Sequence, residues 1–443
     1  MTKYLLGSVA VLLLAGAAGA ADMPVKMPVK APPAVPYDWN GFYIGGYFGD
    51  ALSNAKAHTD ALTSGVADLN IKGFTVGGTV GYNWQFDPRW LVGLEGDIGW
   101  MSINRTVMQW NDFANIGEKV DWYGTLRARF GYVTGPSLLY VTAGGAFVHI
   151  RDEFGGTATA GPTRNESTRG GWTAGGGIET KLSRAWTAKT EYLYVNVGSS
   201  TFVSNVFGGP FGTTFDHSFH VIKTGLNYKL GEPFFDGLPL FGSSPMLPSN
   251  HNWNGFYAGF NLGGGISNVH ALGGGGTLGN GSEEDVNGSG ASGGIQAGYN
   301  YRAWSKFFVG VEADYGYLGV RGSQRDWNDT VTFADKTTWY STARLRVGTT
   351  TGPALLYLTG GGAWVHVTDT LALIGATSQL SRTGSGWTFG GGTEVAIDQR
   401  WSAKIESLYI DAGHDNLAVG SSHGDFKDRF FVVRAGLNMK IGN

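Results

Sequence analysis

The sequence predicts an all-β chain made of two tandem antiparallel β-barrels of eight strands each. Three observations lead to this fold class: a composition rich in glycine and aromatic residues, a long internal repeat, and alternating short and long connections within each repeat. Glycine accounts for 73 of the 443 residues, more than twice its usual share of about 7%. Glycine disfavours helix interiors, whereas aromatic and β-branched residues favour pleated, half-buried surfaces. A helical bundle is therefore excluded.

Net charge and cysteine content exclude several function classes. The 32 basic and 35 acidic residues give a formal net charge of −3. The chain therefore lacks the basic field that attracts phosphate backbones, and nucleic acid is not expected as a partner. It also contains no cysteine, which excludes disulfides, thiolate nucleophiles and cysteine-bound zinc.

The N-terminus has the pattern of a secretory signal peptide. Lys3 supplies a positive charge, an apolar run extends from Leu5 to Ala15, and small residues at Ala18 and Ala20 form a cleavage signal. The prolines that follow indicate an extended, polyproline-like linker. Elsewhere no apolar run reaches the about 20 residues that a spanning helix needs, so entry into a bilayer would require strands.

One unit then occurs twice along the chain. Trp39-Asn-Gly-Phe-Tyr43 returns as Trp253-Asn-Gly-Phe-Tyr257, and Gly225-Leu-Asn-Tyr-Lys229 returns as Gly436-Leu-Asn-Met-Lys440. Several prolines separate the copies, which indicates a second linker because proline is poorly tolerated inside sheets. The expected domains are a signal peptide (1–20), a proline-rich periplasmic linker (21–38), a first barrel (39–231), a proline-rich linker (232–252) and a second barrel (253–443).

Each copy divides into eight strand-like runs bounded by turn residues. In the first copy we expect strands near 41–50, 73–86, 90–100, 119–134, 137–151, 170–182, 186–198 and 217–230. Tight turns alternate with long connections near 51–72, 101–118, 152–169 and 199–216. This alternation places every long loop on one rim, as in outer-membrane barrels.

Alternate side chains separate a charged face from an apolar face in most of these strands. In the fourth strand, for example, Arg127 and Arg129 oppose Leu126 and Phe130. The apolar face carries aromatic rings near the strand ends, which suits a membrane interface. The charged face mixes acids with bases, as a closed interior requires. We therefore expect transmembrane barrels with the charges inside, although the first and fifth strands show no clear alternation.

The interior charges indicate a plugged lumen, because an eight-stranded barrel is just wide enough for its own side chains to fill. A conducting path along the same residues is the alternative, since a pore also needs a charged lining. The expected lumen charge network comprises Glu95, Asp97, Arg127, Arg129, Glu179, Lys181, Lys189, Glu191 and Lys223 in the first copy, and Glu312, Asp314, Arg344, Arg346, Glu394, Lys404, Glu406 and Arg434 in the second.

Several motifs, in order, resemble those of the small OmpA-like or opacity-type outer-membrane β-barrel proteins of Gram-negative bacteria. They are Trp39-Asn-Gly-Phe-Tyr43, Gly81-Tyr-Asn-Trp84, Gly93-Leu-Glu-Gly-Asp97, Gly175-Gly-Gly-Ile-Glu179 and Gly225-Leu-Asn-Tyr-Lys229. The resemblance covers nearly all of both copies. It implies an outer-membrane location and insertion by the outer-membrane assembly machinery, but no particular activity. Family members are usually a single barrel, whereas this chain is doubled.

Catalysis, cofactors and metals are not expected. The strongest enzyme candidates are His149 with Asp152 and His366 with Asp369, because a histidine beside an acid can act as a general base. A spacing of three on a strand, however, puts the two side chains on opposite faces. The nine histidines show no metal-ligand spacing. Glycine clusters lack the Lys-Ser/Thr of a phosphate loop, and the acidic segment from 273 to 293 indicates a surface loop.

The sequence thus indicates an outer-membrane protein with a structural or surface role, surrounded by outer-membrane lipid, with at most a narrow lumen. One alternative merges the copies into a sixteen-stranded barrel, which would be a general porin for small hydrophilic solutes. The proline-rich segment between the copies argues against it, because it is far longer than a turn needs. A second alternative is an adhesin that binds an extracellular partner through its long loops, and the sequence does not identify that partner.

Overall fold

The computed structural model describes residues 38–59, 66–109, 114–155, 162–206, 209–234, 251–274, 280–304, 306–325, 331–350, 352–373, 375–419 and 421–442. Within these ranges all regular secondary structure is β-strand. The same residues contain no helix long and apolar enough to cross a membrane. The predicted signal peptide and nearly all of both predicted linkers lie outside the described residues.

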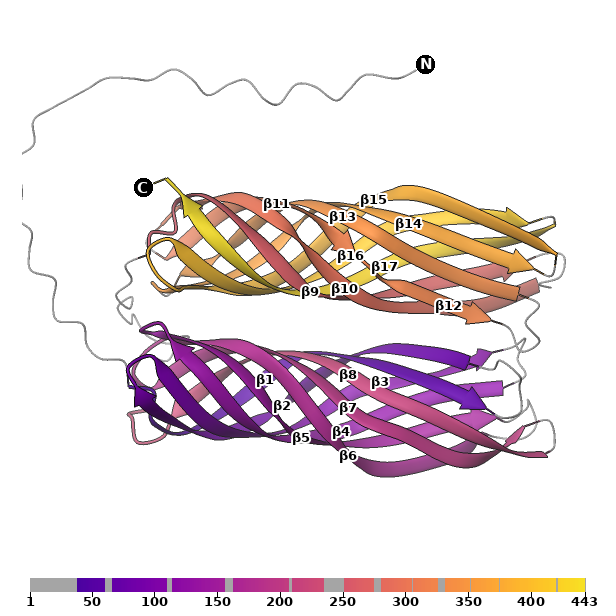
Figure 1. The fold of residues 1–443 in the computed structure, drawn as a ribbon, viewed down its shortest axis with the longest axis horizontal. Coiled ribbons are helices and arrows are strands. Elements are labelled where there is room, and N and C mark those ends of the chain that lie inside the picture. The colour runs from indigo at the N-terminus through magenta and orange to yellow at the C-terminus, as the bar shows by residue number, and fades with distance from the viewer. Residues whose placement is uncertain are drawn as a thin grey trace, which may run out of the picture. The chain divides into compact units, whose positions relative to one another are not determined.

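The first copy forms a closed barrel of eight antiparallel strands (Figure 1). Each strand pairs with the next, and β1 also pairs with β8, so the barrel closes without a strand from the second copy. The strands are β1 (Gly41–Thr59), β2 (Val66–Asp87), β3 (Trp90–Gln109), β4 (Ala114–Val133), β5 (Ser137–Gly155), β6 (Thr163–Lys181), β7 (Trp186–Val206) and β8 (Gly209–Lys229).

The second copy repeats this barrel with one interrupted strand. β11 and β12 both pair with β10 and β13 and form the two parts of a single strand. β9 pairs with both β10 and β17, which closes the sheet. The strands are β9 (Gly255–Gly274), β10 (Asn280–Arg302), β11 (Phe307–Leu318), β12 (Arg321–Arg325), β13 (Val331–Thr350), β14 (Ala354–Leu373), β15 (Ala376–Ala396), β16 (Trp401–Val419) and β17 (Ser422–Ile441).

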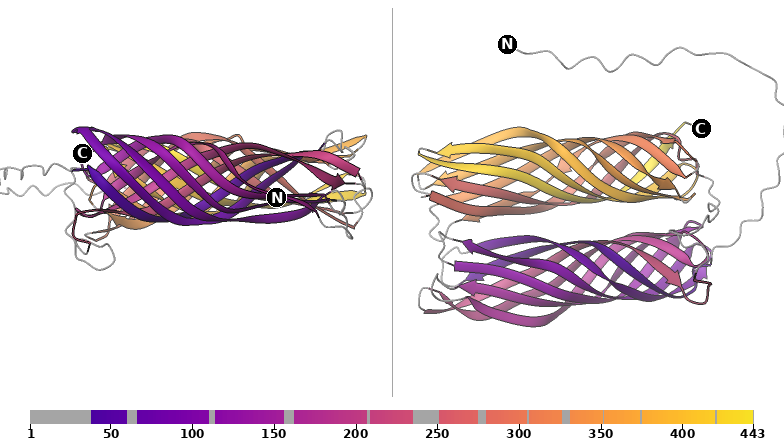
Figure 2. Two further views of the ribbon diagram at one scale, coloured as in Figure 1. Left: turned by 90° about the horizontal axis from the view of Figure 1, so that it is seen from below. Right: turned by 180° about the vertical axis from the view of Figure 1, so that it is seen from behind.

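Two separate barrels confirm the predicted fold class, and the sixteen-stranded alternative is wrong. In a merged barrel β1 would have to pair with a strand of the second copy, but its partners are β2 and β8. The strands of each barrel are tilted around its axis, as two further views show (Figure 2). In each barrel the chain enters and leaves at the same end, which we call the proximal end, and the other end is the distal end (Figure 1).

The strands of the first barrel are about one and a half times as long as the sequence predicts, and the predicted long loops are wrong. Residues 51–59 and 66–72 continue the ladder between β1 and β2, from the pair Ala51 and Gly73 to the pair His58 and Val66. The small and polar residues of these segments are typical of loops. Backbone hydrogen bonds between neighbouring strands, however, do not require apolar side chains. Likewise, residues 280–293 of the predicted acidic loop belong to β10, and 275–279 lie outside the described residues.

Each barrel has two zones along its axis. In the belt zone, next to the proximal end, large apolar side chains point outward and charges point inward. In the distal zone the polarity is reversed: the interior holds apolar residues such as Ile103, Val148 and Phe215. The outward apolar residues of the belt zone are Phe42, Ile44, Phe48, Phe74, Val76, Val80, Tyr82, Trp84, Trp90, Leu94, Ile98, Trp100, Trp122, Leu126, Phe130, Val141, Phe147 and Trp172 in the first barrel.

Aromatic side chains border the belt zone at both ends. At the proximal border the ring of Trp90 stacks on Phe130, with centroids 5.1 Å apart. At the distal border Trp100 lies opposite Trp122 on the neighbouring strand, and Trp172 contacts Tyr194. With a rise of about 3.3 Å per residue and a tilt of about 40°, the strand from Trp90 to Trp100 spans roughly 25 Å, the height of the apolar band of outer-membrane barrels.

Bulges change which side chains face inward in the distal zone. The register of β4 against β5 shifts between Val120 and Trp122, so Glu118 and Val120 face inward although simple alternation from Arg127 would turn them outward. The same shift occurs in β13 at Thr337 and Trp339. Such bulges insert one unpaired residue and reverse the alternation beyond it.

Each copy is expected to fold on its own, because every strand finds both of its neighbours within its own copy. Residues 38–234, expressed alone and refolded in detergent micelles, should show the heat-shifted gel mobility of a closed barrel. Residues 251–443 should behave in the same way. A first copy that folds only in the presence of the second would contradict the barrel closure between β1 and β8.

Candidate functional site

The most concentrated chemistry of the first barrel is the charged interior of its belt zone. Arg127 on β4 is at its centre and contacts three carboxylates. Its guanidinium donates to Glu95 at 2.6 Å, to Glu191 at 2.8 Å, and to Asp97. Lys223 reaches Asp97 at 2.5 Å and Glu191 at 3.0 Å. The side chains of all five residues have no exposed surface.

A second layer lies nearer the proximal end and centres on Arg129. Its guanidinium donates to Glu179 at 2.7 Å and to Glu95 at 3.1 Å. Lys189 donates to Glu95 at 2.8 Å. The Tyr43 hydroxyl accepts a hydrogen bond from Arg129 at 2.6 Å and donates to Glu95 at 2.7 Å. The phenol thus joins the two layers.

The second barrel repeats this arrangement side chain by side chain. Arg344 donates to Glu312 at 2.5 Å, to Asp314 at 2.8 Å and to Glu406 at 3.0 Å. Arg434 replaces the lysine of the first copy and reaches Asp314 at 2.9 Å. The remaining members follow the same pairing: Arg346 with Glu394 and Glu312, Lys404 with Glu312 and Glu406, and Tyr257 with Arg346 and Glu312.

The charges within each network balance. Four acids face four bases in each barrel: Glu95, Asp97, Glu179 and Glu191 with Arg127, Arg129, Lys189 and Lys223, and Glu312, Asp314, Glu394 and Glu406 with Arg344, Arg346, Lys404 and Arg434. Burying an ion is costly unless an opposite charge and hydrogen bonds compensate it. A neutral set in which every charged group has an ion-pair partner meets that condition.

Of the seventeen residues predicted for the lumen network, the structure brings sixteen into these two clusters. Lys181 is the exception. It is buried at the proximal end, where its ammonium lies 4.8 Å from the centre of the Trp39 ring. No described residue forms an ion pair with it within 4 Å.

Sequence reasoning missed the tyrosines of the network. Tyr43 and Tyr257 lie on the first strand of their copies, and Tyr140 and Tyr357 lie on the fifth. These are the strands whose alternation was not clear. Tyr140 donates to Glu191 at 2.9 Å, and Tyr357 donates to Glu406 at 3.0 Å. The repeated motif that ends in Tyr43 and Tyr257 is the sequence feature that could have identified these two tyrosines.

Glycines make room for these large interior groups. Gly144 lies directly opposite Arg127, and a methyl group there would approach the Arg127 Cα to 2.6 Å. At Gly81 a methyl group would lie 2.3 Å from the Tyr43 hydroxyl oxygen. Gly361 and Gly298 have the same roles beside Arg344 and Tyr257. The glycine-rich strands therefore admit a crowded lumen rather than a bound phosphate.

The distal zone of the first barrel contains a separate buried group. His217 on β8 lies between Glu118 and Asp152, with its Nδ1 and Nε2 each 3.2 Å from a carboxylate oxygen. Ser53 donates to Glu118, and Ser200 donates to Asp152 at 2.7 Å. Burial disfavours the charged imidazolium, but the bonds to Asp152 and Glu118 outweigh it and raise the pKa of His217 to about 9.

The two candidate acid–base pairs do not form. His149 lies on the outer wall, stacked on Trp122 and bonded to Glu166 and Thr168. Asp152 faces the interior, bonded to His217 as described above. His366 and Asp369 are separated in the same way: His366 stacks on Trp339 outside, and Asp369 is buried.

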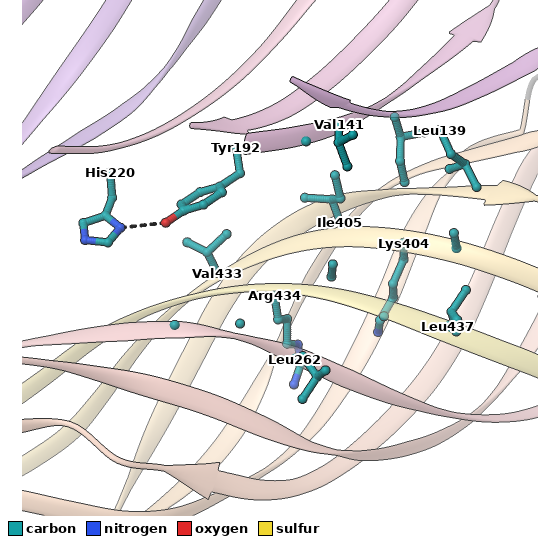
Figure 3. A pocket seen from close by; sticks show the side chains of 18 of the residues that line it. Leu139, Val141, Tyr192, His220, Leu262, Lys404, Ile405, Val433, Arg434 and Leu437 are labelled. Atoms are coloured by element: carbon teal, nitrogen blue, oxygen red, sulfur yellow. Dashed lines mark hydrogen bonds between the residues drawn. The ribbon is translucent and has the colours of Figure 1, made fainter. Parts of the chain in front are cut away.

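The opposite orientation of neighbouring side chains is visible at close range (Figure 3). On the second barrel, Ile405 and Val433 point to the outer side of β16 and β17, whereas Lys404 and Arg434 point to the inner side. On the outer wall of the first barrel, Tyr192 hydrogen-bonds to His220 at 2.8 Å. The outer wall therefore combines aliphatic side chains with a few paired polar groups.

An apolar belt between two aromatic girdles, around a charged and closed interior, defines a transmembrane barrel of the outer-membrane type. The chain belongs to the family described as "Outer membrane protein beta-barrel domain", whose family model matches residues 8–229 and 238–438. The two matches correspond to the two copies. The protein is accordingly an outer-membrane protein of tandem barrels.

Relatives of known name support the same location. The chain is 34% identical over 245 residues to the 31 kDa outer-membrane immunogenic protein of Brucella melitensis, covering 52% of this chain and 100% of that protein. It is 31% identical over 196 residues to a 22 kDa outer membrane protein of Rhizobium leguminosarum, covering 43% of this chain and 78% of that protein. Each relative therefore matches about half of this chain.

Two solved structures are also similar. One is the outer membrane protein OprG from Pseudomonas aeruginosa, 12% identical, which covers 44% of this chain and 98% of that chain with a TM-score of 0.29. The other is Ail, the attachment invasion locus protein of Yersinia pestis, 13% identical, which covers 43% of this chain and 99% of that chain with a TM-score of 0.25.

Replacing Arg127 with methionine should strongly destabilise the first barrel, because Glu95, Asp97 and Glu191 would then share a buried site with too little positive charge. Loss of one partner of a buried ion network costs about 3–5 kcal/mol. Urea unfolding in detergent micelles, followed by tryptophan fluorescence, measures the change. The control is Arg151→Met, which removes an exposed partner of Glu166 and should leave the unfolding free energy nearly unchanged. Equal effects of the two substitutions would contradict the network.

His217 should make the stability of the first barrel depend on pH. Its pKa is 6.5 when unfolded and about 9 when folded. The charged form therefore stabilises the fold fully below pH 6.5, and this contribution of about 3 kcal/mol is lost as the pH rises through 9. The measurement is the unfolding free energy at pH 6 and at pH 10. In the His217→Gln variant the difference between the two pH values should shrink by this amount, and an unchanged difference would refute the assignment.

Proposed function

We propose that this protein has a structural and surface role, with two barrels that do not conduct solutes. The carrying observation is the interior of the belt zone, where the side chains of the charge network are between 0% and 3% exposed. A solute could pass only where these side chains separate. Each separation would leave a buried charge without its partner, which is costly.

The distal zone supports the same proposal. In the first barrel its interior is packed with apolar side chains that are almost fully buried, among them Met101, Ile150 and Phe219. A water-filled pore needs a polar lining along its whole length, as in porins. In the first barrel a charged layer followed by a largely apolar layer provides two barriers in series. The alternative of a conducting path along the charged residues would have to pass both.

We further propose that the termini face the periplasm and that the distal zones project from the cell surface. On β3 the distal zone covers residues 101–109. At a rise of about 3.3 Å per residue and a tilt of about 40° it reaches roughly 20 Å beyond the belt. Its outer wall is polar, with ion pairs such as Arg151 to Glu166 and Arg164 to Glu153. The Brucella relatives are named outer-membrane immunogenic proteins, and surface exposure is proposed here for the distal zones of this chain.

The proposed partners are outer-membrane lipid around the belt and the assembly machinery during insertion. The adhesin alternative can no longer rest on long loops, because the residues expected to form those loops are largely strand. A surface partner would have to contact the rigid distal wall or the hairpin tips. Catalysis is not proposed, since the histidine and the acid of each candidate pair lie on opposite faces of the barrel wall.

Planar lipid bilayers containing the purified chain should show no large, stable current steps. The test variant is Arg127→Ser with Glu191→Ser, which removes one positive and one negative charge and so keeps the lumen neutral while opening space. This variant should conduct more than the wild type, provided its gel mobility still shifts on heating. Large, stable steps from the wild-type protein would refute the closed-lumen proposal.

A further inference from the structure

Three carboxyl groups converge in the distal zone of the second barrel. Asp335 on β13, Asp369 on β14 and Asp428 on β17 all point into the interior and are at most 2% exposed. One carboxylate oxygen from each lies within 4.8 Å of the others. Asp335 and Asp369 occupy directly opposed positions on neighbouring strands. Like charges in such positions repel each other.

The acidic cluster has almost no hydrogen-bond partners of its own. Five of its six oxygens, both of Asp335, both of Asp369 and Oδ1 of Asp428, are buried and form no hydrogen bond among the described residues. The sixth, Oδ2 of Asp428, accepts from Arg382. Buried acceptors of this kind are normally satisfied, and each unsatisfied one costs about 1–3 kcal/mol.

The groups around the cluster do not supply the missing positive charge. Arg382 on β15 is the cation that bonds to Asp428, but it also pairs with Asp415 on β16. The hydroxyl of Ser267 on β9 is buried and faces Asp335, and among the described residues it forms no hydrogen bond of normal geometry. A fourth oxygen, from a different strand, therefore also faces the cluster.

The first barrel shows what is missing. The shift of 217 positions that relates these strands makes Glu118 the counterpart of Asp335 and Asp152 the counterpart of Asp369. On the last strand the shift is 211, as between Gly225 and Gly436, and the counterpart of Asp428 is His217. The first barrel thus places a cation between its two acids, whereas the second places a third acid there.

The electrostatic consequence is that the empty cluster cannot stay fully charged. Three buried carboxylates face one arginine, Arg382, and that arginine is shared with Asp415. Either protons or a cation must compensate the cluster at neutral pH.

We propose that the second barrel binds one divalent cation, with Ca²⁺ as the best fit, between the carboxylates of Asp335, Asp369 and Asp428. Carboxylate and hydroxyl oxygens are the ligands that hard cations prefer. Ca²⁺ binds oxygens at about 2.3–2.6 Å, so two oxygens on opposite sides lie about 5 Å apart. A spread of at most 4.8 Å matches one shared ion. The Ser267 hydroxyl provides a further ligand.

This site departs from the sequence expectation of no metal. That expectation rested on histidine spacing, whereas the three ligands here are aspartates from three strands. The other acidic group with convergent oxygens, Glu95, Asp97 and Glu191, carries no such proposal, because Arg127 and Lys223 already compensate it. Bound cation in the second barrel would take the role of the His217 imidazolium in the first.

The test uses the full chain, refolded in detergent micelles free of lipopolysaccharide and treated with EDTA. Isothermal titration with CaCl₂ should show one saturable site per chain. Saturating Ca²⁺ should also raise the unfolding temperature of the second barrel, because a ligand that binds only the folded state stabilises it. Absence of saturable Ca²⁺ binding by the wild-type protein would overturn the proposal.

Substitutions assign the site. Asp369→Asn should weaken Ca²⁺ binding at least tenfold, and the matched control Asp152→Asn, at the equivalent position of the first barrel, should leave it unchanged. Asp428→His introduces the residue of the first copy. It should abolish Ca²⁺ binding while the calcium-free barrel becomes more resistant to heat, which separates loss of the site from misfolding.

A gain of binding completes the test. Glu118→Asp combined with His217→Asp gives the first barrel the acids of the second and should raise the stoichiometry from one Ca²⁺ to two. A different result is expected if the three carboxyls share protons instead. Stability of the second barrel would then fall as the pH rises above about 4, where carboxyl groups of the unfolded chain lose their protons, and Ca²⁺ would change neither the stability nor the effect of Asp428→His. That outcome would overturn the cation site.

Discussion

The structure of each barrel depends on the need to compensate every charge that is buried in its lumen. Four acids and four bases meet this need only if each strand keeps its register, since a slip by one residue would turn its charges toward lipid. Glu95 opposite Arg127 and Glu191 opposite Lys223 are cross-strand pairs of this kind. Glycines fit the same crowded interior: Gly81 and Gly298 leave room for the rings of Tyr43 and Tyr257. Gly144 and Gly361 let the backbones of neighbouring strands approach closely beside the arginines.

In both zones of the wall, side chains alternate between an inner and an outer face. The zones differ because the outer face has different surroundings in each. Within the belt the outer side chains meet lipid, so the charges lie inside. Beyond Trp100 and Trp122, where we propose that the outer wall meets water, the interior is largely apolar, as in a soluble barrel. The sequence differences between the two copies follow the same division into a belt zone and a distal zone. In the belt network only Lys223 is changed, to Arg434, whereas the distal interior exchanges His217 for Asp428.

Much of the belt could be predicted from sequence, and most of the distal zone could not. Alternation alone identified the charged members of the network but not its tyrosines, and tight turns fixed pairs such as Glu179 with Lys189. Contacts across the lumen, such as Arg127 with Glu191, depend on barrel closure and have no local signal. The distal parts of the strands lack large apolar residues on their outer face, so their sequence predicts loops. The bulge at Asp121 then reversed the alternation, which hid the inward orientation of Glu118.

An aromatic layer allows the two zones to vary independently. In the first barrel the ammonium of Lys223 lies 4.5 Å from the centre of the Tyr47 ring, and Tyr123 is buried on the distal side of the network. In the second, the Tyr340 hydroxyl accepts from Arg434 at 2.8 Å. A tyrosine presents a polar tip to charges and an apolar ring to a hydrophobic core. Because this layer ends the charge network, the distal interior can hold a histidine in one barrel and a third acid in the other without disturbing that network.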